Sequence, residues 1–444
     1  MNFIELKPTE ENISSTLLND SIGNNNNLFS FLEFVTTLEG NSTVALNGRW
    51  GTGKTFFVKQ AIMMIDKLKI NDANNEYLKL LLRSRKDPAY NLSVYYDAWT
   101  NDNDEDPILS LIFEIISQLD LSDKKFKEKD WKGLIVAVSD CLTGGSLSGI
   151  LDKAKNENIL QAIKNNRDLH EKINEFFNNL LPEVANRLII FVDELDRCKP
   201  TYAIKLLERI KHYFDNDNIT FVFSVNIEQL QHSIAKVYGD QFDSYNYLNR
   251  FFQYTFNMPK ISVSQYFALS EQQQFDYLYK EISQIAIDVF ELSMREAISY
   301  WKMSSRIRNK SFQIYQSMVI QQNELNFFYR LYVPIMIILN IRSLDGYNEF
   351  IDCKDFESLK RLSVLLLNNS DTYQYFKESI LYHFDRRNSD KDENEVFLQN
   401  LENTYKIVFR FEDYKSINRN EWPDIGVINI YEKTKGIILS LFNL

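Results

Sequence analysis

The stretch from Gly48 to Thr55 constrains this chain most, because its sequence GRWGTGKT has the spacing of a P-loop, G-x-x-x-x-G-K-[ST]. The short apolar and β-branched run at 42–47 before it predicts a strand, and residues 56–64 after it contain neither Gly nor Pro and predict a helix. A phosphate-binding loop requires this order of strand, glycine loop and helix. With only 13 Gly in 444 residues, a chance match in this context is rare.

The residue types of this loop suit the binding of phosphate groups. Glycines allow backbone angles and close approach that a Cβ would block, so that amide N–H groups can converge on phosphate oxygens. The helix that begins near Lys54 adds free N–H groups and a positive dipole end. Lys54 can reach the β- and γ-phosphates, and the Thr55 hydroxyl can ligate Mg²⁺. We therefore expect ATP and Mg²⁺ as ligands, with the nucleotide bound by Gly48, Trp50, Gly51, Thr52, Gly53, Lys54, Thr55 and Phe56.

A second run, at 186–194, places two acids after five consecutive apolar residues. This pattern predicts a parallel strand buried on both faces, with Asp193 and Glu194 at its carboxyl end, where open α/β sheets bind ligands. We expect Asp193 to hold Mg²⁺ together with Thr55, and Glu194 to orient or deprotonate an attacking water. The alternative is an acidic strand end that caps the following helix.

Three further segments complete the expected sheet. Residues 91–99 predict a strand that ends in an aromatic, 219–226 predict a buried strand, and 247–256 predict a helix end and a last strand. Asn226, at the end of the second of these, can hydrogen-bond the γ-phosphate or the attacking water, and a capping role for it is the alternative. The predicted fold class is α/β, with a parallel sheet covered by helices on both faces, a helical insertion and a mostly helical C-terminal region.

Composition limits the classes of protein that remain. A chain of 444 residues and 52.4 kDa is too long for one core, so we expect more than one domain. A net charge of −11 argues against a protein that coats nucleic acid, so a nucleic-acid partner is not indicated. The three widely spaced Cys fit neither a disulfide framework nor a zinc site, and the N-terminus has no signal-peptide pattern. These features predict a cytoplasmic protein.

Two segments between the P-loop and the acidic strand have alternative interpretations. The acids at 101–106 could hold a cation, but their position before a helix that starts at Pro107 favours complementation of the helix dipole. The apolar patch at 133–151 is nearly long enough to span a bilayer, yet it contains Asp140 and several Ser and Thr. We expect the insertion at about 120–181 to pack on the protein or to contact a partner, and we do not expect membrane contact.

Four ordered motifs over about residues 28–310 resemble those of the KAP family of P-loop NTPases. The P-loop carries Trp50 before its second Gly, YDAW at 96–99 is similar to the family's aromatic-x-Ala-Trp strand end, and VDELDRC at 192–198 resembles its extended Walker B motif. YLNRFFQ at 247–253 is similar to its Tyr-Leu-Glu-Lys-x-x-Gln element. The resemblance implies an additional-strand (ASCE, AAA+-like) P-loop NTPase core with a helical lid, and an insertion that carries transmembrane helices in many members.

The resemblance also suggests arginines that respond to the nucleotide. Within 291–296, Ser293 is an expected N-cap with Glu296 three residues later, the pattern of a capping box. Arg295 in this segment matches the family's lid arginine that senses the γ-phosphate, and a surface salt bridge is the alternative. Arg250 stands where the family usually has Lys. Whether Arg250 or Arg295 acts within its own subunit or on a neighbour stays open.

These observations predict Mg²⁺-dependent ATP binding and hydrolysis by a molecular switch. Lys54, Glu194, Asn226 and Arg295 are the expected catalytic residues. The expected partners are further copies of the chain and a separate effector, by analogy with bacterial members that act in phage defence. The alternatives are a nucleotide-gated oligomeric scaffold with little turnover and a nucleic-acid-stimulated ATPase. The expected domains are an N-terminal leader helix at 1–40, the NTPase core at 41–260, a helical lid at 261–320 and a helical C-terminal domain at 321–444.

Overall fold

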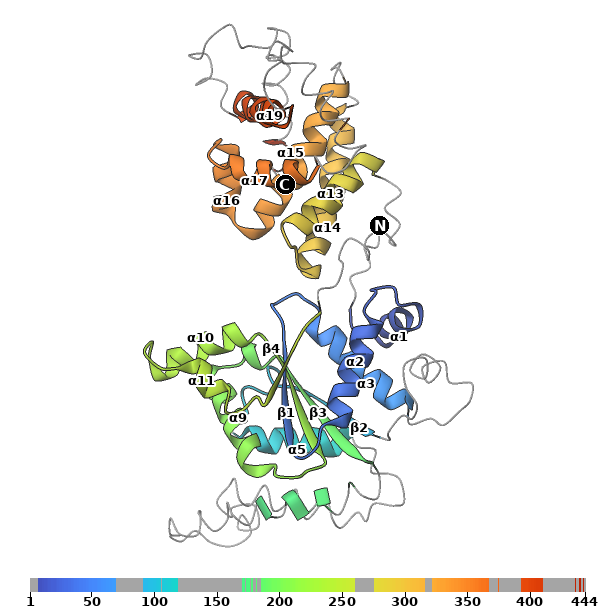
Figure 1. Ribbon diagram of the computed structural model, residues 1–444, viewed down its shortest axis with the longest axis vertical. Coiled ribbons are helices and arrows are strands. Elements are labelled where there is room, and N and C mark those ends of the chain that lie inside the picture. The colour runs from blue at the N-terminus through green and yellow to red at the C-terminus, as the bar shows by residue number, and fades with distance from the viewer. Residues whose placement is uncertain are drawn as a thin grey trace. The chain divides into compact units, whose positions relative to one another are not determined.

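The chain forms two compact units, Leu6–Ile261 and a second one that combines Ser262–Leu444 with Met1–Glu5 (Figure 1). We call them the α/β unit and the helical unit. The computed structural model describes residues 7–68, 91–104, 106–118, 185–259, 275–315, 322–366 and 393–409, together with single residues within 170–181, at 374 and within 436–442.

The α/β unit is built on a five-stranded parallel sheet with the strand order β2-β3-β4-β1-β5. The strands are β1 (Ser42–Asn47), β2 (Asn91–Asp97), β3 (Arg187–Asp193), β4 (Ile219–Val225) and β5 (Tyr254–Asn257). Strand β4 lies between β1 and β3, so the P-loop strand and the acidic strand are separated by one additional strand. This arrangement confirms the predicted fold class, and it places all five carboxyl ends at one edge of the sheet.

Helices cover both faces of this sheet (Figure 1). One face packs in a single apolar cluster with α5 (Pro107–Gln118), α9 (Pro200–Tyr213), α10 (Ile227–Tyr238) and α11 (Ser244–Leu248). Strands β3 and β4 are buried along their whole length, as expected for parallel strands between two helical layers.

The other face is covered by α2 (Asn25–Thr37) and α3 (Lys54–Leu68), which contact each other and the sheet, and α1 (Glu10–Asn19) packs on α3. The expected helix before the P-loop strand is therefore present as α2. Its Phe31 ring lies 5.3 Å from the ring of Phe57 on α3 and 5.0 Å from that of Phe256 on β5. These ring contacts fasten the start of the chain to the P-loop helix.

The helical unit contains α13 (Tyr277–Val289), α14 (Met294–Tyr315), α15 (Gln322–Arg342), α16 (Leu344–Ile351), α17 (Phe356–Leu366) and α19 (Glu393–Phe409). The predicted capping box at the start of α14 is confirmed. The Ser293 N–H donates to Glu296 Oε2 at 2.7 Å, and the Glu296 N–H donates to Ser293 Oγ at 3.3 Å.

The expected insertion at 120–181 lies outside the described residues apart from a few positions after 169, and so does the apolar patch at 133–151. Part of the expected lid, 261–274, also lies outside them. Within the part of the chain that is described, no helix combines the length and the hydropathy needed to cross a bilayer.

Candidate functional site

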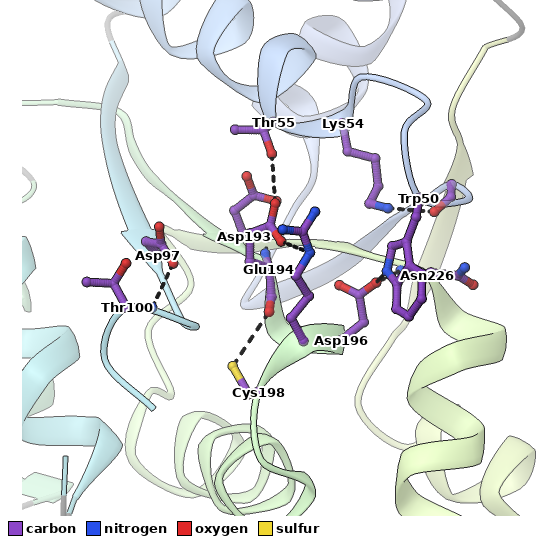
Figure 2. A network of polar contacts seen from close by, with 12 residues as sticks. Trp50, Lys54, Thr55, Asp97, Thr100, Asp193, Glu194, Asp196, Cys198 and Asn226 are labelled. Carbon is purple, nitrogen blue, oxygen red and sulfur yellow. Dashed lines mark hydrogen bonds and ion pairs between the residues drawn. The ribbon is translucent and has the colours of Figure 1, made fainter. Parts of the chain in front are cut away.

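The residues expected to bind a nucleotide gather at the carboxyl edge of the sheet. Figure 2 shows Lys54 and Thr55 at the start of α3, facing the acids that follow β3. The Thr55 hydroxyl donates to Glu194 Oε1 at 3.3 Å, across 139 positions of sequence. Because β1 and β3 are parallel and separated by only one strand, the P-loop and the acids reach the same edge.

The backbone of the loop depends on its glycines. Gly51 and Gly53 have φ of 81° and 88°, in the left-handed region that side chains with a Cβ rarely adopt. A Cβ on Gly48 would lie 2.8 Å from Met258 Cγ. The Phe57 N–H donates to the Gly53 carbonyl at 2.9 Å, so the amide groups of the preceding residues begin the helix without intrahelical acceptors.

Lys54 is buried and rests on its own loop. Its Nζ donates to the Gly48 carbonyl at 2.6 Å and to the Arg49 carbonyl at 3.4 Å. Burial lowers the pKa of Lys54, while the carboxylates of Asp196, Asp193 and Glu194 oppose this effect, Asp196 most strongly. The ammonium group is therefore a cation surrounded by acids. Its present hydrogen-bond acceptors are neutral carbonyl groups, which an anion can replace.

Asp193 is the most buried acid of the site, with 1% of its surface exposed. Its Oδ1 accepts from the Glu194 N–H at 3.0 Å and its Oδ2 accepts from the Tyr95 hydroxyl at 3.2 Å. Tyr95 was not expected from the sequence. Tyr95 lies two residues before Asp97 on β2, so these two side chains point to the same face of the sheet. Asp97 pairs with Asp193 in the register of β2 and β3, which places Tyr95 and Asp193 on that same face.

Glu194 follows β3 in a left-handed backbone conformation, with φ 61° and ψ 21°. For a residue with a Cβ this conformation costs roughly 1–2 kcal/mol, and such strain concentrates at functional sites. While Oε1 accepts from Thr55, the other carboxylate oxygen is paired with Arg197 Nε. Burial and the neighbouring Asp193 carboxylate raise the pKa of Glu194, and Arg197 partly opposes them.

Asn226 follows β4 and caps α10, because its Oδ1 accepts from the Gln229 N–H at 3.3 Å. The structure thus contains the capping interaction that was the alternative to a phosphate contact. The Asn226 backbone N–H donates to Asp196 Oδ2 at 3.1 Å, and the Trp50 indole N–H donates to the same oxygen at 2.6 Å. Asp196 was not expected as a site residue, although it lies within the segment at 192–198 that resembles the extended Walker B motif.

Two other predicted nucleotide-binding residues have side chains that are occupied or buried. Thr52 Oγ1 donates to the Arg49 carbonyl at 2.8 Å and so helps to close the loop on itself. The Phe56 ring is buried, so only its backbone N–H can face a ligand. The exposed Arg295 belongs to the helical unit. Arg250 is also exposed, and its carbonyl accepts from Lys211 Nζ at 2.7 Å.

The acidic segment after β2 contacts α9 and the start of α5. Asp106 Oδ1 accepts from the Ile108 N–H at 2.9 Å, and its Oδ2 lies 3.3 Å from Arg209 Nη2 and 3.5 Å from Lys205 Nζ. Asp102 Oδ2 accepts from the Lys199 N–H at 3.2 Å. These contacts agree with the helix-end interpretation. Among the described residues, no group of three or more His, Cys, Asp or Glu is arranged to hold a metal ion.

Comparison with known proteins gives a family match and likenesses among solved structures. The sequence model of the KAP family P-loop domain matches residues 25–344. Among solved structures, the chain is similar to the Aeropyrum pernix ORC2 protein in its ADPNP and ADP complexes, with 11% identity and a TM-score of 0.33 over 87% of this chain and 92% of that chain. A likeness of this size supports no argument about function. No curated protein matched the sequence.

Proposed function

Because the chain belongs to the KAP family of P-loop NTPases, we propose that it binds ATP with Mg²⁺ at the carboxyl edge of its sheet and hydrolyses it. One observation carries this proposal: the Thr55 hydroxyl at the start of α3 and the Glu194 carboxylate just after β3 meet at 3.3 Å, although they lie 139 positions apart in the sequence. A loop that binds phosphate and an acid that can act on water are thereby within reach of one bound triphosphate.

The residues present fit both ligands. Mg²⁺ prefers oxygen donors, and the Thr55 hydroxyl and the Asp193 carboxylate would hold it. The amides that begin α3, the loop of Gly51 and Gly53, and the Lys54 ammonium would hold the phosphates. Bound Mg²⁺ would neutralise charge that develops on the phosphate oxygens.

The chain's own residues would then exchange partners. Lys54 would leave the carbonyls of Gly48 and Arg49 for phosphate oxygens, which accept a stronger, charge-assisted hydrogen bond. Glu194 would accept a proton from the attacking water, once Thr55 or Arg197 releases one of its oxygens. Asn226 uses Oδ1 in the helix cap, which leaves its amide Nδ2 to donate to the γ-phosphate or the water.

We further propose that nucleotide turnover operates a switch. In this proposal Arg295, at the start of α14, senses the γ-phosphate, the chain assembles with further copies of itself, and a separate effector receives the signal in a bacterial cytoplasm. Anti-phage defence is the biological setting that the family resemblance suggests. The proposal keeps the expected domains, which are the leader helix at 1–40, the NTPase core at 41–260, the helical lid at 261–320 and the C-terminal domain at 321–444.

One observation favours the alternative of a nucleotide-gated scaffold with little turnover. Both carboxylate oxygens of Glu194 are occupied in the structure, by Thr55 and by Arg197. These contacts stabilise the ionised carboxylate and compete with the attacking water for it, so Glu194 would accept a proton slowly, and ATP binding would dominate over hydrolysis.

The test compares ATP binding, phosphate release and mass in solution for the purified chain, with and without Mg²⁺. Fast turnover without a change in mass supports the enzyme, and an ATP-dependent increase in mass with slow turnover supports the scaffold. A rate unchanged by added DNA or RNA excludes the nucleic-acid-stimulated ATPase. A well-folded protein that binds no ATP contradicts the proposal.

A further inference from the structure

Asp196 is a buried carboxylate that joins two separate parts of the site. It lies in the short helix η1 (Leu195–Arg197) after β3, with 7% of its surface exposed. Its Oδ2 accepts from the Trp50 indole N–H of the P-loop at 2.6 Å and from the Asn226 backbone N–H at the end of β4 at 3.1 Å. Burying a carboxylate is costly unless it is hydrogen-bonded, and these two contacts offset that cost for Asp196.

Trp50 is an unusual partner for a buried acid, because 48% of its own surface is exposed. Its ring thus lies at the surface while its N–H reaches inward to Asp196 (Figure 2). Trp99, at the end of β2, is exposed to 53% and has the Arg197 guanidinium 5.7 Å from its ring centre. The two tryptophans are alike in exposure, and the hydrogen bond to Asp196 belongs to Trp50.

The glycines of the loop make such an anchor necessary. The start of the loop is fixed by the Gly48 N–H, which donates to the Val225 carbonyl at 3.0 Å, and its end is fixed by α3. Between these points lie Gly51 and Gly53, and glycine has more backbone freedom than any other residue type. Binding of a phosphate would have to restrict this freedom, at a cost in conformational entropy. A contact that orders the loop in advance removes part of this cost from binding.

We propose that Asp196 and Trp50 form a latch that holds the P-loop in the shape that accepts a triphosphate. Asp196 is a positioning residue, which acts through Trp50 and Asn226 and not by contact with the reacting atoms. This inference rests on the proposed nucleotide binding at the same site and assigns it a determinant of affinity.

A double-mutant cycle tests the latch, with Trp50→Phe, Asp196→Ala and the double variant in the full chain. ATP binding in the presence of Mg²⁺ is measured by calorimetry, and KM and kcat are taken from phosphate release. We expect Trp50→Phe to weaken binding by about tenfold, the size of one hydrogen bond to a charged group, and to raise KM with little change in kcat. Since both changes remove the same bond, the double variant should bind about as weakly as Asp196→Ala alone.

Two controls separate the latch from a general loss of structure. Trp99→Phe makes the same chemical change at an equally exposed tryptophan, and ATP affinity should not change. Each variant should unfold cooperatively near the wild-type Tm. If Asp196→Ala does not fold, Asp196→Asn takes its place; it keeps an acceptor oxygen, so the departure from additivity should be smaller but of the same sign.

The outcomes are distinct for the latch and for the proposed function. If the wild-type chain binds ATP and the effects of Trp50→Phe and Asp196→Ala on affinity add up in the double variant, the latch is overturned and the proposed function is left intact. An unchanged affinity of Trp50→Phe does the same. A folded wild-type chain that binds no ATP overturns both.

Discussion

The two units of this protein treat buried polar groups differently. At the carboxyl edge of the sheet, the α/β unit buries three charged side chains, Lys54, Asp193 and Asp196. Among the described residues of the helical unit, the buried polar side chains are all hydroxyl groups, on Ser283, Ser304, Ser363 and Thr404. Burying a charge costs far more than burying a hydroxyl, so the sheet edge carries a desolvation cost that these hydroxyls do not.

The hydroxyls of the helical unit serve the fit between helices. Tyr279 donates to Ser304 at 3.1 Å and Tyr300 donates to Ser283 at 2.7 Å, each bond joining α13 to α14. The arginines there bind helix ends, as Arg361 does with the Val289 carbonyl at 2.6 Å. These hydroxyls and this arginine have their partners within the protein, whereas the proposed function assigns a ligand to the charges at the sheet edge. Substitutions in the two units should therefore change different quantities.

The largest expected effect is on hydrolysis. Glu194→Gln should reduce phosphate release by about 10²- to 10⁴-fold, because an amide does not accept the proton from water, while ATP binding is retained. Single-turnover phosphate release measures this. Glu357→Gln, the same change on an exposed position of α17, is the control. A Glu194→Gln protein that hydrolyses ATP at the wild-type rate would remove Glu194 from the chemistry.

The next effect is on affinity. Lys54→Ala should weaken ATP binding by about 10- to 150-fold, since it removes charge-assisted hydrogen bonds to phosphate. Lys360→Ala in the helical unit should leave the affinity unchanged. Calorimetric titration of both variants measures the difference, and equal affinities would mean that the two units do not differ in the way proposed.

A smaller effect is expected on the requirement for Mg²⁺. Tyr95→Phe removes the hydroxyl that donates to Asp193. This change should raise the Mg²⁺ concentration for half-maximal turnover by about tenfold, because losing a group that orients a metal ligand weakens metal binding by at least about this factor. Tyr300→Phe also loses one hydroxyl, but it should leave the Mg²⁺ dependence unchanged and lower the free energy of unfolding by about 1 kcal/mol. Titration with Mg²⁺ and chemical unfolding distinguish the two, and the reverse pattern would contradict the comparison.

The smallest effect concerns stability and pH in the helical unit. Burial raises the pKa of Glu296, but hydrogen bonds from Ser293 and the charge of Arg342 outweigh it, so that the pKa lies below 4.5. A lowered pKa in the folded state stabilises the protein above the unfolded value of 4.5, and this contribution is lost as pH falls through the folded value. Glu296→Gln should therefore lower Tm at neutral pH, and this difference should shrink as the pH falls below 4.5. A Tm difference that grows on acidification would contradict this sign.

Much of the site was predictable because its signals are local. The spacing of Gly51, Gly53 and Lys54 determines a loop before a helix, and the apolar run before Asp193 determines a buried strand. The capping box of Ser293 and Glu296 has its two partners three residues apart, so their meeting follows from helix geometry.

The sequence by itself therefore determined the P-loop, the strands that present it and its acids, and the family to which the chain belongs. The tertiary structure decided which side chains those acids contact. Tyr95 meets Asp193 across 98 positions and Trp50 meets Asp196 across 146. Such contacts depend on strand order, register and the conformation of the loop, which place distant residues side by side and leave no periodic trace in the sequence.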